Sequence, residues 1–169
     1  MQKFDSACSV LAITGGMSKR YCPLMAYGLR NGGLGLLELT RDEPIIVWSL
    51  ESSQTNGSAV CCLKACDLDP SSGLHDLIVA RDDSSIEIYS YDEASSVPTL
   101  RFESKLGEAI TGLDVGYLNS PNKLEILLSA YSGKIFGLQD SSSRSKPPAD
   151  AALRAAAKKD KQEKIAGLQ

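Results

Sequence analysis

The sequence is poor in the residues that carry most catalytic and metal chemistry. It has one histidine (His75) and one tryptophan, and aromatic residues make up only 6% of its 169 residues. A single histidine leaves little room for histidine-rich metal sites or a Ser-His-Asp triad. No apolar run approaches the ~18–20 residues of a membrane-spanning helix. Residues 1–16 do not resemble a secretory signal, so we expect neither a span nor a leader.

The cysteines do not form a metal-binding or disulfide pattern. They are odd in number, lie in apolar surroundings and include no C-x-x-C motif; they are Cys8, Cys22, Cys61, Cys62 and Cys66. We therefore expect free thiols in a cytosolic protein and no zinc site. Cysteine-based catalysis is not expected either, because no carboxylate is recognisably placed to orient His75.

The composition is that of a globular protein, but its charge is unevenly distributed. Apolar residues make up 43% and charged residues 23%, with a net charge of −3. Residues 144–169 carry seven basic and three acidic side chains, a net +4. The remaining eleven basic and eighteen acidic residues leave −7 on residues 1–143. An acidic body disfavours a nucleic-acid partner. The basic tail is interpreted as a solvated helix face, with an acidic partner as the alternative.

Internal repetition is the most informative feature. The segment 76–89 (DLIVARDDSSIEIY) aligns without gaps with 125–138 (EILLSAYSGKIFGL), at an offset of 49. A third copy, 24–37 (LMAYGLRNGGLGLL), lies 52 residues upstream of the first. Each copy is an apolar run, a polar turn and an alternating run, which is typical of a β-hairpin.

The hairpins differ in turn chemistry and share doubly apolar first strands. Asn31-Gly32 and Ser132-Gly133 place glycine at the turn, whereas 82–85 (DDSS) has none and must rely on an aspartate. The runs 77–80 and 126–128 are apolar at every position, which a strand needs only where both of its faces are buried.

Further short strands precede the hairpins, which gives about four strands in about 50 residues. That is the size of a β-propeller blade. We predict an all-β partial propeller over 1–139, with three four-stranded antiparallel blades at about 1–40, 41–92 and 93–139. Known propellers close with ~4–8 blades, so further blades are expected elsewhere. Tryptophan and most tyrosines and phenylalanines are expected to pack between blades.

The remaining residues predict a different kind of structure. Residues 140–149 (DSSSRSKPPA) are interpreted as a linker, and 150–169 as a helix that could begin a coiled coil. The heptad pattern there is poor, so a coiled coil is not established by this stretch alone.

One loop resembles a hard-cation site. Its candidate calcium ligands are Asp67, Asp69, Ser71 and Asp76, before and after a glycine, as in the calcium loops of FG-GAP propellers. The glycine comes one place late, and Pro70 lies inside the loop. A solvent-facing turn held by Asx-type hydrogen bonds is the favoured interpretation. We predict no catalytic residues and no cofactor, and we expect His75 to be a surface or cross-strand residue.

Several short motifs in order resemble one family. Segments 76–83 (DLIVARDD), 86–92 (IEIYSYD) and 98–102 (PTLRF), followed by 106–111 (LGEAIT) and 129–133 (SAYSG), are similar to the β-propeller of the Bardet–Biedl syndrome 7 family, subunits of the BBSome. The resemblance covers roughly residues 24–138. It implies the C-terminal part of that propeller and the start of the coiled-coil region, with blades before residue 1 and further domains after residue 169.

The resemblance implies a non-enzymatic scaffold or adaptor. Such a subunit would belong to a coat-like complex that moves membrane proteins into and out of cilia. Its partners would be other BBSome subunits and, indirectly, ciliary cargo, with peripheral membrane association through the complex. It would be found in the cytoplasm and at the ciliary base, cilium and ciliary membrane. The alternatives are an adaptor of another vesicle coat and an FG-GAP calcium-binding propeller.

Overall fold

The described part of the chain is built from strands. The computed structural model describes residues 6–17, 21–92, 97–119, 121 and 123–139, and the account below concerns these. Their regular structure is eleven strands and one short 3-10 turn, η1 (Ser52–Gln54). No helix among them has the length and hydropathy needed to cross a membrane. The predicted linker (140–149) and helix (150–169) lie outside the described residues.

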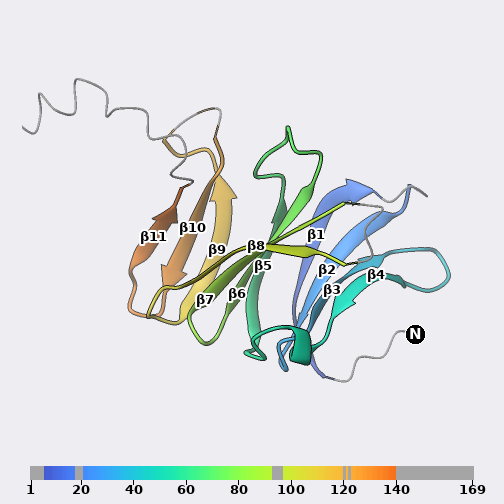
Figure 1. Cartoon of the computed structure of the whole chain (residues 1–169), viewed down its shortest axis with the longest axis horizontal. Coiled ribbons are helices and arrows are strands. Elements are labelled where there is room, and N and C mark those ends of the chain that lie inside the picture. Colours follow the sequence, from blue (N-terminus) through green and yellow to red (C-terminus); the bar gives the residue numbers. More distant parts are fainter. Residues whose placement is uncertain (1–5, 18–20, 93–96, 120, 122, 140–169) are drawn as a thin grey trace, which may run out of the picture. The chain divides into compact units, whose positions relative to one another are not determined.

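The strands form three antiparallel sheets (Figure 1). The first contains β1 (Cys8–Met17), β2 (Pro23–Leu29), β3 (Leu34–Glu38) and β4 (Ile45–Leu50). The second contains β5 (Val60–Cys66), β6 (His75–Arg81), β7 (Ser85–Tyr91) and β8 (Thr99–Lys105). The third contains β9 (Ile110–Gly116), β10 (Glu125–Ala130) and β11 (Ile135–Leu138). Every strand pairs with its neighbour in sequence within a sheet, so each sheet is a meander of the kind a propeller blade requires.

The sheets are offset by one strand from the predicted blades. β4 pairs with β3 in the first sheet, although the repeat grouped it with the second unit. β8 likewise pairs with β7, so the third sheet has three strands among the described residues instead of the predicted four. A repeat aligned by sequence does not show where the chain crosses to the next sheet, because any strand of a cyclic pattern can be taken as its first.

The sheets pack face to face along their first strands: β1 contacts β5, and β5 contacts β9. The first and second sheets enclose one apolar cluster, to which β6 contributes Leu77 and Val79. The second and third enclose another, to which β6 contributes Ile78 and Ala80. All four of these side chains are fully buried. The prediction that this strand is buried on both faces is therefore confirmed, and alternate residues serve two different cores.

The three hairpin turns share one backbone conformation. Gly32, Ser84 and Gly133 occupy equivalent repeat positions and have positive φ values of 91°, 73° and 84°. Each also donates its N–H to the carbonyl oxygen three residues earlier. In the turn without glycine, Asp83 Oδ1 accepts hydrogen bonds from Ser85 N (3.1 Å) and Ser85 Oγ (2.6 Å). The predicted reliance of this turn on an aspartate is confirmed.

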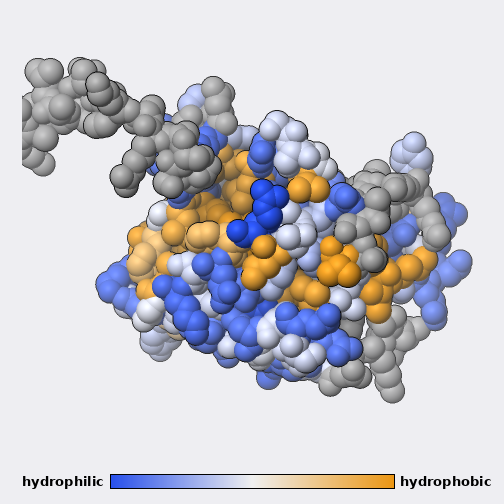
Figure 2. Space-filling view, in the orientation of Figure 1, coloured by the Kyte–Doolittle hydropathy of each residue, from blue (hydrophilic) through white to orange (hydrophobic). Residues whose placement is uncertain are grey.

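Apolar side chains also lie on the faces that point away from the second sheet. On β1, Leu11 and Ile13 are 55% and 78% exposed, and on β11 Ile135 is 74% exposed. On the face shown in Figure 2, apolar surface lies over the third sheet at the left and near β4 at the right, with hydrophilic surface and smaller apolar patches between. These faces favour association with other apolar surfaces, because burying exposed aliphatic groups away from water lowers the free energy.

Candidate functional site

The loop between β5 and β6 is organised by its own aspartates. Asp69 Oδ1 accepts hydrogen bonds from Ser71 N (3.0 Å) and Ser71 Oγ (2.5 Å). These bonds lower the pKa of Asp69, since they stabilise its ionised form. Ser72 Oγ donates to the Asp69 carbonyl oxygen (2.7 Å), and Gly73 completes the turn at φ 67°. The interpretation as a solvent-facing Asx-type turn is confirmed.

Asp76 anchors this loop from inside the sheet. It is only 6% exposed, and its Oδ2 accepts a hydrogen bond from Leu68 N (3.0 Å), while Ser90 Oγ donates to Oδ1. Glu125, its equivalent at the repeat offset of 49, is 3% exposed and accepts a bond from Asn119 Nδ2 (2.6 Å). A buried carboxylate must be hydrogen-bonded, and here the preceding loop supplies a donor to each carboxylate, while Ser90 of β7 supplies another to Asp76.

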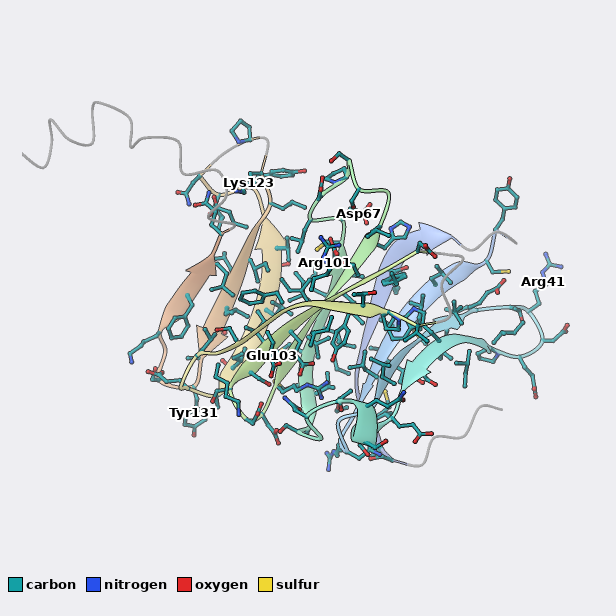
Figure 3. The ribbon with its side chains drawn as sticks, in the orientation of Figure 1. Arg41, Asp67, Arg101, Glu103, Lys123 and Tyr131 are labelled. Carbon is teal, nitrogen blue, oxygen red and sulfur yellow. The ribbon has the colours of Figure 1, made fainter. Side chains whose placement is uncertain are left out.

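Asp67 pairs with the only histidine. Asp67 Oδ1 lies 2.8 Å from Nδ1 of His75, the first residue of β6, and both side chains are partly exposed. Asp67 lies on the β5–β6 loop (Figure 3). His75 also lies opposite Tyr91 in the β6–β7 register, with ring centroids 5.7 Å apart. The prediction of a surface or cross-strand histidine is confirmed. The expectation that no carboxylate orients it is wrong, because the β5–β6 loop folds back and brings residue 67 beside residue 75.

The candidate calcium ligands each have separate protein partners. Asp67 is paired with His75, Asp69 with Ser71, and Asp76 with Leu68 and Ser90. No set of three or more His, Cys, Asp or Glu side chains that could hold a metal ion occurs among the described residues. The loop is therefore held by hydrogen bonds, among them the Asp67–His75 contact.

The most polar part of the interior is a network centred on Arg81. The side chains of Arg81 and Glu87 are 0% and 3% exposed, and Arg81 Nη2 lies 2.8 Å from Glu87 Oε2. Arg81 Nε donates to the same oxygen (2.9 Å), as does the Tyr89 hydroxyl (3.0 Å). Burial, followed by the Glu87 charge, raises the pKa of Tyr89 to about 12. The phenol is therefore a neutral donor at physiological pH.

The same guanidinium reaches across to the first sheet. Arg81 Nη1 donates to the carbonyl oxygen of Gly32 (2.9 Å), in the β2–β3 turn, and to that of Ser58 (2.7 Å), ahead of β5. Asn56 Nδ2 makes a second link, to Ser85 Oγ (2.9 Å). Arg81 thus joins the second sheet to the turn of the first, and this role is structural.

Sequence reasoning missed this network, although a signal was present. Arg81 and Glu87 are, with Asp76, the charged residues of two strands that are otherwise largely apolar and buried. A charge in such a strand must be paired, so two opposite charges on adjoining strands predict each other as partners. The carbonyl partners could not be found in this way, because the sequence does not show which turn lies beside Arg81.

The expectation for aromatic residues holds for part of the set. Trp48 and Tyr91 are 2% and 3% exposed, with ring centroids 5.5 Å apart in the core between the first two sheets. Phe102, Tyr117 and Tyr131 are instead 41%, 61% and 86% exposed. Tyr131 lies at the β10–β11 turn, far from the Asp67 loop (Figure 3).

The three stacked meanders agree with comparisons to known proteins. A family model described as the BBS7 beta-propeller matches residues 2–140. The chain belongs to the BBS7 β-propeller family. It is 34% identical over 114 residues to the mouse protein "BBSome complex member BBS7", covering 68% of this chain and 16% of that protein. It is 29% identical over 119 residues to the Caenorhabditis elegans protein "BBSome complex member bbs-7", covering 70% and 16%.

The chain spans about 16% of the length of these curated relatives. Among the described residues, the buried side chains of Asp76, Glu125 and Arg81 each hold a turn or loop in place.

Proposed function

We propose that this chain is the propeller portion of a BBSome subunit and acts as a non-enzymatic scaffold. The family match over residues 2–140 carries the proposal. The names printed for the mouse and nematode relatives, both BBSome complex members, support it. The buried side chains of Arg81, Asp76 and Glu125 hold turns and loops, which fits a rigid contact surface better than a reaction centre.

The finer features of the proposal follow from such membership. The chain would contact other BBSome subunits, and through the complex it would serve the traffic of membrane proteins into and out of cilia. Ciliary cargo would be bound indirectly, and the membrane would be reached peripherally. The protein would then be found in the cytoplasm and at the ciliary base, cilium and ciliary membrane. No nucleic-acid partner is proposed, since residues 1–143 carry a net charge of −7.

Co-purification from ciliated cells tests the proposal. The full-length protein that contains this chain is tagged and its associated proteins are identified by mass spectrometry, with BBSome subunits as the expected result. A Val79→Asp variant, which places a charge in the core between the first two sheets, should lose the association. Arg41→Ala, at an exposed position, is the matched control and should retain it.

Two outcomes would contradict the proposal. One is a folded protein that captures no BBSome subunit. The other is capture of subunits of a different coat in their place, which would favour an adaptor of another vesicle coat.

A further inference from the structure

The packing of one sheet on the next uses the same repeat positions each time. Leu34 of β3 and its equivalent in β7, Ile86, are fully buried, each in the cluster that its sheet shares with the following sheet. The equivalent residue of the third sheet is Ile135 of β11, which is 74% exposed. The first and third sheets lie on either side of the second (Figure 1). The third sheet therefore exposes the kind of face on which a following sheet packs.

Small residues mark the place where the first strand of the following sheet lies. Gly28 of β2 has no room for a side chain, because a Cβ there would lie 2.5 Å from Val60 Cγ1 of β5. Its equivalent in β6 is Ala80, which is fully buried in the cluster between the second and third sheets. The third member of this set is Ser129 of β10, which is partly exposed. Its short side chain leaves space for a further strand of the same kind.

The first strand of the chain exposes the opposite half of this contact. The pairing registers make Cys8, Val60 and Ile110 equivalent residues of β1, β5 and β9. Val60 and Ile110 are 1% and 5% exposed, because they pack on the preceding sheet, whereas Cys8 is exposed. Leu63 of β5 is likewise 8% exposed, and its equivalent Leu11 of β1 is 55% exposed. The first sheet thus lacks a preceding sheet among the described residues.

A side chain at a β-bulge joins each sheet to the next. Ser9 Oγ, in the bulge of β1, donates a hydrogen bond to the Val60 carbonyl oxygen of β5 (2.6 Å). At the same place in β5, the Cys61 thiol donates to the Ile110 carbonyl oxygen of β9 (3.5 Å). The equivalent residue of β9 is Thr111, which also carries a donor and is exposed. The carbonyl oxygen at the start of a docked first strand would meet this hydroxyl group.

We propose that the outer faces of the first and third sheets are the two halves of one interface, and that a second copy of this chain occupies it. The first sheet of each copy packs on the third sheet of the other, which continues the sheet packing already present inside the chain. A head-to-tail contact of this kind forms a ring when it closes. Two copies supply six sheets, within the ~4–8 blades at which propellers close. The expected assembly is therefore a closed dimer with both outer faces buried.

Two variants, each altered on one face, test the proposal in the 169-residue chain. Leu11→Lys changes the first sheet and Ile135→Lys the third, at side chains exposed enough for each variant to fold. Sedimentation velocity should show a wild-type dimer. Each variant alone should dimerise at least about 100-fold more weakly, because docking would bury an unpaired lysine. An equimolar mixture should form a heterodimer, since each variant keeps the face that the other has lost.

Leu100→Lys, on β8 of the second sheet, is the matched control and should dimerise like the wild type. Circular dichroism checks that each variant keeps its strands; if one does not, the wild-type assembly state decides the question. A wild type that stays monomeric, with its faces bare or covered by residues 140–169, would overturn the proposal, as would growth beyond the dimer. Dimers of Ile135→Lys alone, or a mixture of folded variants without a heterodimer, would exclude the head-to-tail contact.

Discussion

Arg81 and Glu87 form an ion pair from which water is excluded, with Nη2 and Oε2 2.8 Å apart on adjoining strands of one hairpin. Three further hydrogen bonds surround the pair. The Tyr89 hydroxyl donates to the Glu87 carboxylate, and the Arg81 guanidinium donates to the carbonyl oxygens of Gly32 and Ser58. The network therefore links two sheets, and Arg81 Nη2 contacts Glu87 without a further hydrogen bond. Removing one partner would leave a buried charge uncompensated.

Replacing Arg81 by methionine should destabilise the protein strongly. The variant leaves the Glu87 carboxylate buried without its cation and deprives two carbonyl oxygens of a donor. We expect the free energy of unfolding to fall by about 3–5 kcal/mol, measured by urea denaturation. Lys105→Ala is the matched control, because Lys105 pairs with Asp83 at the surface and its loss should cost less than about 1 kcal/mol. Equal effects in the two variants would show that the buried pair is not a major link.

The hairpin turns predict opposite effects for introducing a glycine and for replacing one. Ser84→Gly should stabilise the protein by about 0.5–1 kcal/mol, because Ser84 holds a φ of 73° that glycine adopts without strain. Gly133→Ala should destabilise the protein by about 1 kcal/mol, because an alanine is strained at the φ of 84° found there. A Cβ at this position would meet open space, so no steric clash adds to that cost. Gly32→Ala should cost more, because its Cβ would lie 2.6 Å from the backbone of Gly57. Thermal unfolding of the three variants gives the ranking, and a destabilised Ser84→Gly would refute this account of the turn.

The turn at Asp83 predicts sensitivity to acid. Burial raises the pKa of Asp83, but hydrogen bonds from Ser85 and Lys105 outweigh it and lower the pKa from 3.8 to about 2. The folded state thus prefers the ionised form, whose contribution is complete above about pH 4 and is lost as the pH falls through 2. Asp83→Asn should reduce the slope of stability against pH between 4 and 2. If urea denaturation showed the same slope of stability against pH for Asp83→Asn and the wild type in this range, the role given to Asp83 would be contradicted.

Exposed apolar faces predict self-association of the isolated chain. Leu11 and Ile13 lie on the face of β1 that points away from the second sheet and are more than half exposed. Sedimentation velocity should show association that grows with concentration and weakens in Ile13→Lys. Tyr131→Ser, at an exposed turn, is the control and should sediment like the wild type. A wild-type chain that remains monomeric at high concentration would contradict the prediction.

Much of the architecture could be predicted from the sequence because it depends on local patterns. The doubly apolar run 77–80 indicated a strand buried on both faces, and the repeat offset of 49 located equivalent turns and the equivalent carboxylates Asp76 and Glu125. The all-β stacked arrangement followed from these features, which rest on side-chain alternation and turn chemistry that short stretches of chain already contain. The family was indicated separately, by the resemblance of several short motifs.

Other features required the tertiary structure, because they depend on which distant segments become neighbours. The assignment of β4 and β8 to sheets is decided by strand pairing. The Asp67–His75 pair depends on how the β5–β6 loop folds back. The sequence shows Arg81 only as a charge beside an apolar strand and does not indicate its carbonyl partners. Only packing of the second sheet against the first brings the Gly32 carbonyl oxygen to its guanidinium, where the absence of water makes the contact strong.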